Sequence, residues 1–293
     1  MKTAVVTDTN SGISADEARE LGAWSIEMPV LIDGEVRYEG KDLSYEEFFQ
    51  LLADGHLATT SQPSPGDVCD LWETILSSGY DELVYLPMSA GLSYSFDTAR
   101  IASAEFGGRV RVVDDRRISV TLRSDVMEAL RLAEAGVSAA HIQSKLQERA
   151  GLSSIYLAVD DLGYLKRGGR VSPAAASIGS ILKVKPILTV TDGRFEPLYK
   201  EKGMTKAIAK LFRAAHHDVK KKFGDREEGV AIGVTGSGLS HNQEAELLDN
   251  AKKEFPKAEV FFDRLPLSIS VHTGPGAIGI GLHQKISEEE MAL

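Results

Sequence analysis

The chain has 293 residues, which is long for one compact domain and favours two domains that share an interface. Hydrophobic residues make up 43% and charged residues 26%, a composition that supplies a large core and argues against extensive disorder. The 33 basic and 43 acidic side chains give a formal charge of -10, which repels phosphate backbones. We therefore expect no nucleic-acid partner.

The single cysteine, Cys69, excludes an intrachain disulfide framework and a cysteine-built metal site. It lies in an apolar helical pattern, which predicts a buried thiol. Residues 1–8 lack the apolar stretch of a signal peptide, and no apolar run approaches the ~20 residues that span a bilayer. We expect a cytoplasmic protein without stable membrane insertion.

In the first half of the chain, short β-branched runs alternate with amphipathic helices, a pattern typical of a mainly parallel sheet covered by helices. Ser44 and Glu47 form a capping box, and Ser64 with Pro65 opens another helix. The predicted strands are 3–7, 83–86 and 110–113. The predicted helices are 15–21, 44–52, one that opens at 64–65, one that starts near 93, 120–135 and 139–149.

From about Gly151 the pattern changes, because hairpin signals such as Asp192-Gly193 now mix with helices. The predicted strands are 154–159, 186–190, 195–200 and 230–235, followed by two last strands that flank a glycine-rich turn. The predicted helices are 205–223 and 242–254. We therefore predict an α/β protein of two domains. Residues 1–150 form a mainly parallel sheet flanked by helices, and residues 151–293 form a mixed α/β domain with antiparallel strands.

Five segments place small polar or cationic residues at sharp turns: 7–11, 59–64, 89–93, 166–170 and 272–276. The first and third each follow a predicted strand and precede a helix, which is where open α/β sheets bind ligands. Hydroxyls and free backbone N–H groups at a helix start suit a carboxylate or a phosphate. Each hydroxyl also has a structural interpretation: Ser64 and Ser93 as helix caps, Thr60 and Ser61 as turn residues.

The segment Arg167-Gly168-Gly169-Arg170 is more specific, because its glycines let the backbone approach a ligand and its guanidiniums offer planar donors to an anion. A structural salt bridge is the alternative. His272 is followed by Thr273 and a Gly-Pro-Gly turn, so we predict a ring held at a fixed loop position. A surface histidine is the alternative for this residue.

No catalytic or metal motif stands out. The histidines show no metal-binding spacing and no His-Glu-x-x-His motif. The 274–279 stretch matches a dinucleotide fingerprint formally, but only 14 residues follow Gly279, too few to complete a βαβ unit. There is no Walker lysine loop, and the segment around Ser93 lacks the second glycine of a nucleophile elbow. The sequence thus predicts anion binding without a catalytic residue or metal.

In order and spacing, these segments resemble the DegV family, which includes the fatty-acid-binding subunits of bacterial fatty acid kinase. The resemblance covers essentially the whole chain and is strongest at 60–64, 91–93, 164–170, 185–188 and 272–276. The chain departs from the family pattern at Asn10, at Tyr94, where a glycine is common, and at Asp115, where a serine is common.

The resemblance implies a long-chain fatty acid in a tunnel at or near the domain interface. It implies that hydroxyls at Thr60 or Ser61 and at Ser93 hold the carboxylate, with Arg170 and the His272-Thr273 pair beside the head group. A separate kinase subunit would bind ATP and phosphorylate the carboxylate, so no cofactor is expected other than the fatty acid itself. Ile178, Ile181 and Leu182 are candidate tunnel walls or ordinary core residues.

The leading hypothesis is a fatty acid carrier that presents its ligand to that kinase subunit, and the acyl phosphate would feed phospholipid synthesis. The alternative is a hydrolase or transferase that acts on a phosphorylated or acylated small molecule through His272 and Arg170. A lipid sensor without a kinase partner is a third hypothesis. Preferred chain length, saturation and oligomeric state are not set by these residues.

Overall fold

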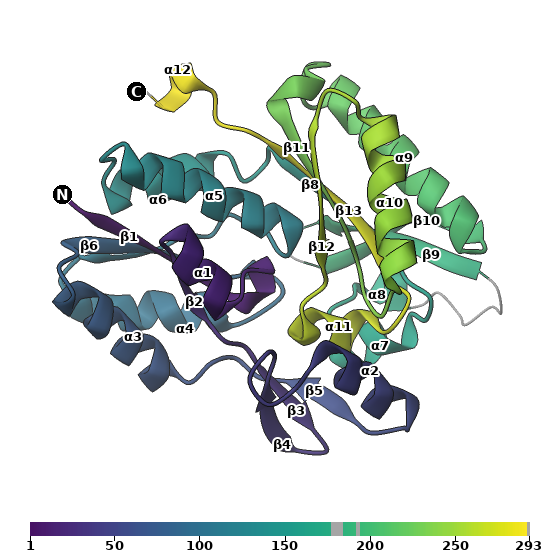
Figure 1. Ribbon diagram of the computed structural model, residues 1–293, viewed down its shortest axis with the longest axis horizontal. Helices are drawn as coiled ribbons and strands as arrows, with labels where there is room; N and C mark the ends of the chain where they lie inside the picture. Colours follow the sequence, from purple (N-terminus) through teal and green to yellow (C-terminus); the bar gives the residue numbers. More distant parts are fainter. Residues whose placement is uncertain (177–183, 192–193, 292–293) are drawn as a thin grey trace.

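The computed structural model describes residues 1–176, 184–191 and 194–291. The tunnel-wall candidates Ile178, Ile181 and Leu182, and the Asp192-Gly193 turn, lie outside the described residues. Figure 1 shows two sheets of different size side by side, with a small third sheet at the base of the molecule between them.

The first sheet is parallel throughout and belongs to the first half of the chain. Its strands, in spatial order, are β2 (Trp24–Ile26), β1 (Thr3–Asp8), β6 (Glu82–Leu86) and β7 (Val110–Val112). Every residue of β1 and β6 is buried, because helices cover both faces. The predicted parallel sheet is confirmed.

The helices divide between the two faces of this sheet (Figure 1). One face packs on α1 (Ala15–Leu21), α5 (Val120–Glu134) and α6 (Ala139–Glu148), and the other packs on α3 (Pro65–Ser77) and α4 (Ser95–Ala102). A short 3-10 turn, η2 (Ser103–Phe106), extends α4. Ser64 precedes α3 but makes no side-chain cap, and Cys69 is half-buried rather than fully buried.

A small antiparallel sheet in the first half was not predicted. It consists of β4 (Glu35–Tyr38), β3 (Pro29–Ile32) and β5 (Ala58–Thr60), and α2 (Tyr45–Ala53) lies between β4 and β5 in sequence. Its apolar side packs on α11 (Leu267–Thr273) of the second half, where Val30 and Phe48 meet Leu267. This packing brings Thr60, at the end of β5, to the second half of the chain.

The second sheet is mixed and has six strands. In spatial order they are β10 (Arg194–Lys202), β9 (Val184–Thr191), β8 (Ser153–Ala158), β13 (Ile278–Gln284), β11 (Val230–Gly236) and β12 (Glu259–Arg264). Neighbours are antiparallel except β11 and β12. One face packs on α9 (Met204–Lys221) and α10 (His241–Glu254) (Figure 1). The predicted mixed α/β half with antiparallel strands is confirmed.

Helix α5 also packs against the second sheet, at two glycines. Gly233 of β11 and Gly281 of β13 are paired in register. A Cβ on Gly233 would lie 2.4 Å from the Cβ of Val120, and one on Gly281 would lie 2.7 Å from its Cγ2. The two bare backbones therefore let the start of α5 lie directly on the sheet. This contact fixes the first sheet against the second.

The segment between β12 and β13 corrects one prediction. Sequence analysis placed His272 in a loop, but it lies in the last turn of the helix α11. Apolar residues alternate with serines over residues 267–271, a pattern that suggests a strand. The segment nevertheless forms a helix, because other elements pack on several of its sides. Leu267 contacts the small sheet while Ile269 faces a different cluster. Ser270 satisfies its hydroxyl by donating to the carbonyl of Leu265 at 3.0 Å.

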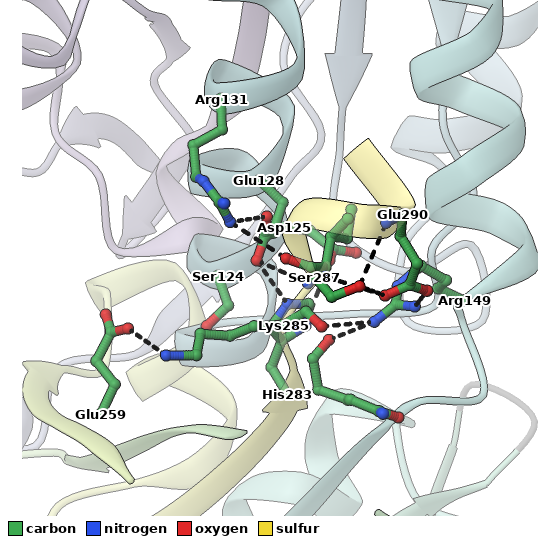
Figure 2. A network of polar contacts seen from close by, with 12 residues as sticks. Ser124, Asp125, Glu128, Arg131, Arg149, Glu259, His283, Lys285, Ser287 and Glu290 are labelled. Atoms are coloured by element: carbon green, nitrogen blue, oxygen red, sulfur yellow. Dashed lines mark hydrogen bonds and ion pairs between the residues drawn. The ribbon is translucent and has the colours of Figure 1, made fainter. Parts of the chain in front are cut away.

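The remaining short helices complete the fold. They are η1 (Thr9–Ser11), α7 (Gly163–Gly168), α8 (Pro173–Ala176), η3 (Glu227–Gly229) and α12 (Glu288–Met291). Helix α12 contacts the first half again, because Glu288 pairs with Arg131 of α5 and Glu290 pairs with Arg149 (Figure 2).

A buried polar network centred on Arg117 lies close to this contact, and Figure 2 shows three residues that belong to it, Asp125, Arg149 and His283. Arg117, which has 0% exposure, forms an ion pair with Asp125 at 2.6 Å. Its Nη1 donates to Nδ1 of His283 at 2.6 Å, and its Nη2 donates to the carbonyl of Arg149 at 3.0 Å. Burial and the charge of Arg117 lower the pKa of His283, so the neutral ring accepts this bond. The network joins α5 to β13.

We expect Glu39→Gln to stabilise the protein at pH 8 more than at pH 5. Burial raises the pKa of Glu39 from 4.5 to about 7, although its carboxylate accepts the N–H of Leu267 at 2.8 Å. A carboxyl whose pKa is higher in the folded state loses stability as pH rises through this window. Glutamine keeps the acceptor without the charge, so the gain at pH 8 is about 1–2 kcal/mol.

Thermal unfolding at both pH values measures this difference. Glu35→Gln, an exposed change in the neighbouring strand, is the matched control. Equal changes in melting temperature for Glu39→Gln at pH 5 and pH 8 would contradict the expectation.

Candidate ligand-binding site

A cavity of about 390 Å³ is lined by residues from both halves of the chain. All six residues proposed from sequence line it: Thr60, Ser61, Ser93, Arg170, His272 and Thr273. They come from the end of β5, the loop after β6, the segment after α7, and α11. The fold therefore brings together segments more than 200 residues apart, as the 212-residue separation of Thr60 and His272 illustrates.

The carboxyl ends of β1 and β6 form one side of the cavity. Because the two strands are parallel neighbours, the turns that follow them lie together. The hydroxyl of Ser93 accepts the backbone N–H of Ser95 at 3.1 Å and lies 2.8 Å from the hydroxyl of Ser95. Ser93 thus orders the turn before α4, but it is not the cap that the structural interpretation predicted, because the N-cap residue is Tyr94 and no side chain caps the helix. Its hydroxyl also lines the cavity.

Thr60 and His272 form a direct pair. The Oγ1 of Thr60 lies 2.8 Å from Nε2 of His272. Burial, helped by the charge of Arg170, lowers the pKa of His272 to about 4, so the ring is neutral at pH 7. The other edge of the ring lies against α7, where a Cβ on Gly168 would be 2.3 Å from Nδ1. Gly168 therefore makes room for the ring.

Arg170 supplies the positive charge of the site. It follows Gly169, whose φ of +69° lets the chain turn out of α7. Its Nε donates to the carbonyl of Leu92 at 3.4 Å, and its Nη1 donates to that of Gly168 at 2.5 Å. Among the described residues, no carboxylate forms an ion pair with Arg170. These residues therefore do not support the alternative that Arg170 serves in a structural salt bridge. Its charge faces the cavity without an acidic partner.

The remaining two predicted residues differ in accessibility. Ser61 is exposed, immediately after β5. Thr273 has 1% exposure, and its hydroxyl donates to the carbonyl of Ile269 at 3.4 Å inside α11. Thr273 therefore contributes to the wall more than to the polar end.

Sequence analysis missed a polar pair in the wall. The side-chain oxygen of Asn10 accepts the hydroxyl of Ser268 at 2.8 Å, and its amide donates to Asp8 at 2.8 Å. Burial raises the pKa of Asp8 to about 6. Asn10 belongs to the first of the five polar segments, a signal that was available. Ser268 lies outside all five polar segments, so no sequence signal marked it.

The apolar part of the wall was missed as well. It is formed by Met28, Met88, Leu92, Ile118, Phe195 and Ile269. These residues come from separate elements and follow no shared periodicity, so no sequence signal separates them from core. The cavity therefore has a polar part, with hydroxyls, a neutral imidazole and an unpaired guanidinium, and an apolar part. This arrangement suits an amphipathic anion.

Two other classes of site find no support in the described part of the chain. No group of three or more His, Cys, Asp and Glu residues there is arranged to hold a metal ion. Across the same residues, no helix combines the length and apolar character needed to span a bilayer.

The fold and site define a class of α/β proteins with two large sheets and a small third one, which enclose a cavity with polar and apolar parts. The family model described as "Uncharacterised protein, DegV family" matches residues 2–285. A DegV domain-containing protein of Streptomyces coelicolor is 33% identical over 279 residues, which cover 94% of this chain and 96% of that protein. The chain therefore belongs to the DegV family.

Solved structures agree with this assignment. A DegV family protein from Thermus thermophilus, described with fatty acid binding, has a TM-score of 0.83 and 30% identity over 97% of this chain and 100% of that one. DegV from Bacillus subtilis, described as a fatty acid binding protein, has a TM-score of 0.85 and 28% identity over the same shares, 97% and 100%. The fold of this chain is thus that of solved DegV proteins.

Proposed function

We propose that the protein binds a long-chain fatty acid in the 390 Å³ cavity and presents its carboxylate to a separate kinase subunit, which phosphorylates it to an acyl phosphate. The observation that carries this proposal is the convergence of Thr60, Ser93, Arg170 and His272 on one cavity with an apolar wall. The fatty acid binding described for the relatives from Thermus thermophilus and Bacillus subtilis supports the choice of ligand.

The chemistry of the two ends fits this ligand. Each buried methylene contributes about 0.8 kcal/mol, so a chain of ~16 carbons gains on the order of 10 kcal/mol before ordering costs. Hydroxyl donors and an unpaired guanidinium suit a carboxylate, and the charge of Arg170 also suits the more negative acyl phosphate. We place the ligand where residues 1–150 meet residues 151–293, and the protein in the cytoplasm.

Mass spectrometry of an organic extract of the natively purified protein tests the ligand. We expect a stoichiometric fatty acid, and an empty extract after incubation with a panel of fatty acids would contradict the proposal. Ser93→Ala should weaken binding by about 1.5–3 kcal/mol, because a donor to a charged group is lost. Ser103→Ala is the control, because this half-buried serine after α4 donates its hydroxyl to the carbonyl of Arg100 and lies outside the cavity lining. Equal affinities for the two variants would limit the role of Ser93 to the turn before α4.

One observation favours the alternative, a hydrolase or transferase. The 2.8 Å contact between Thr60 and a neutral His272 is the geometry of a hydroxyl beside a general base. Turnover of an acyl phosphate by the isolated protein, lost on His272→Ala, would support this alternative. Absence of turnover with retained fatty acid would support the carrier.

A further inference from the structure

A second cavity, of about 510 Å³, adjoins the first. The two cavities share Thr60, Arg170 and His272, and their other lining residues differ. The second is lined by the segment from Leu52 to Thr59 and by α7. The three shared residues therefore form the wall between the two cavities, so a head group held there is reached from both sides.

The second cavity adds another cation. Arg167 is exposed and stacks on the ring of Tyr164, with its guanidinium carbon 4.5 Å from the ring centroid. Tyr164 is itself fixed, because a Cβ on Gly274 would lie 2.4 Å from its ring. Among the described residues, no carboxylate forms an ion pair with Arg167. Its charge is thus held beside the cavity; the Asp161 carboxylate lies nearby without forming an ion pair, since a Cβ on Gly163 would be 2.9 Å from Asp161 Oδ1 and 3.4 Å from Arg167 Nη1.

The charges around the shared wall exceed what a carboxylate requires. A fatty acid carries one negative charge, which Arg170 alone can balance. Arg167 and Arg170 together present two positive charges on either side of Gly168-Gly169, next to the neutral donors Thr60 and His272. Two carboxylates near this cavity have other partners: Asp33 Oδ2 lies 2.6 Å from Nδ1 of His56, and Asp161 accepts the N–H of Gly163 at 2.7 Å. Two unpaired guanidiniums match a head group with two negative charges and three acceptor oxygens.

We propose that the second cavity is the subsite for the phosphoryl group of an acyl phosphate, with Arg167 as the residue that distinguishes this ligand from the free fatty acid. The acyl chain occupies the first cavity, so this inference rests on the proposed function. The acyl carbonyl lies at the shared wall, and the phosphoryl oxygens extend past His272 to Arg167. Arg167 is a specificity residue, and no covalent step is assigned to it.

The test compares two ligands of equal chain length: a fatty acid and its non-hydrolysable acyl phosphonate. Calorimetry gives both dissociation constants for the wild type, for Arg167→Gln and for Arg100→Gln, an exposed arginine on α4. Arg167→Gln should weaken acyl phosphonate binding at least fivefold more than fatty acid binding, and Arg100→Gln should leave the ratio unchanged. Equal weakening of both ligands, or of neither, overturns the inference.

A third titration separates the bound acyl phosphate from a free anion. Inorganic phosphate is added to the wild-type protein loaded with fatty acid. Weak binding compared with the acyl phosphonate supports the proposed linked ligand. Tight phosphate binding that Arg167→Gln removes, with no change for the phosphonate, assigns the cavity to free phosphate and overturns the inference. A wild-type protein that binds neither fatty acid nor phosphonate overturns the proposed function itself.

Discussion

Replacement of Arg117 by methionine is expected to lower the free energy of unfolding by about 3–5 kcal/mol, because removal of one partner of a buried ion pair leaves an uncompensated charge. Arg117 and Asp125 have side-chain exposures of 0% and 1% and are 2.6 Å apart. Burial and the charge of Asp125 raise the pKa of the adjacent Asp115 well above its usual range. Asp125 is the ion-pair partner that loses Arg117 in the variant.

Chemical denaturation measures the change. Arg116→Met is the matched control, since Arg116 is the exposed neighbour and its backbone φ of 60° is the same for either side chain. A surface change of this kind alters stability by about 0.5 kcal/mol at most. The double variant Arg117→Met with Asp125→Leu should recover part of the loss, because no buried charge remains. Equal stabilities of Arg117→Met and Arg116→Met would contradict the account.

This network also positions the ligand cavity. The carbonyl of Arg117 accepts the N–H of Ser89 at 2.8 Å, which anchors the loop that carries Ser93. The next residue, Ile118, lines the cavity, and the N–H of Ser119 donates to the carbonyl of Asn10 at 2.8 Å. The buried charges therefore hold the turns after β1 and β6 in place. Stability and ligand geometry depend on the same contacts.

Elements with strong local signals could be predicted from the sequence. The strand β1 is a β-branched run, and α2 begins at Ser44, whose hydroxyl accepts the N–H of Glu47 at 3.1 Å. The small sheet escaped prediction although it carried a hairpin signal. Asp33 and Gly34 have φ values of 51° and 90°, as an Asp-Gly turn requires. The short strands on either side made this signal easy to overlook.

The candidate site likewise contains residues that could be predicted from the sequence and residues that could not. Polar residues at turns could be identified as candidates, because five such segments occur and two of them lie between a strand and a helix, although each hydroxyl alone also had a structural interpretation. The apolar wall could not be predicted, since Ile118 and Phe195 come from distant parts of the chain and look like core residues. His272 was predicted at a loop position because a Gly-Pro-Gly turn follows Thr273, whereas the buried residues before that turn form the helix α11. The apolar wall and the position of His272 both depend on tertiary contacts, which local sequence patterns do not contain.

The replacement Gly168→Ala is expected to weaken fatty acid binding by about 1–2 kcal/mol, or roughly 5–30-fold. The added Cβ would lie 2.3 Å from Nδ1 of His272, so the ring must move. That movement breaks the 2.8 Å contact with Thr60 and displaces two groups of the head-group wall together. Calorimetry with the fatty acid identified by extraction gives the affinity.

The Gly168→Ala change tests the position of the His272 ring separately from the stability of the fold. Gly168 is the last residue of α7 and does not have a positive φ, so alanine suits the backbone there and removes none of its hydrogen bonds. Gly151→Ala is the control, because a Cβ at that exposed position meets nothing within 4 Å. Weaker binding for Gly168→Ala, with melting temperatures equal across the variants, assigns the effect to His272. Unchanged affinity would mean that the ring shifts freely and that the wall between the two cavities does not hold the carboxylate.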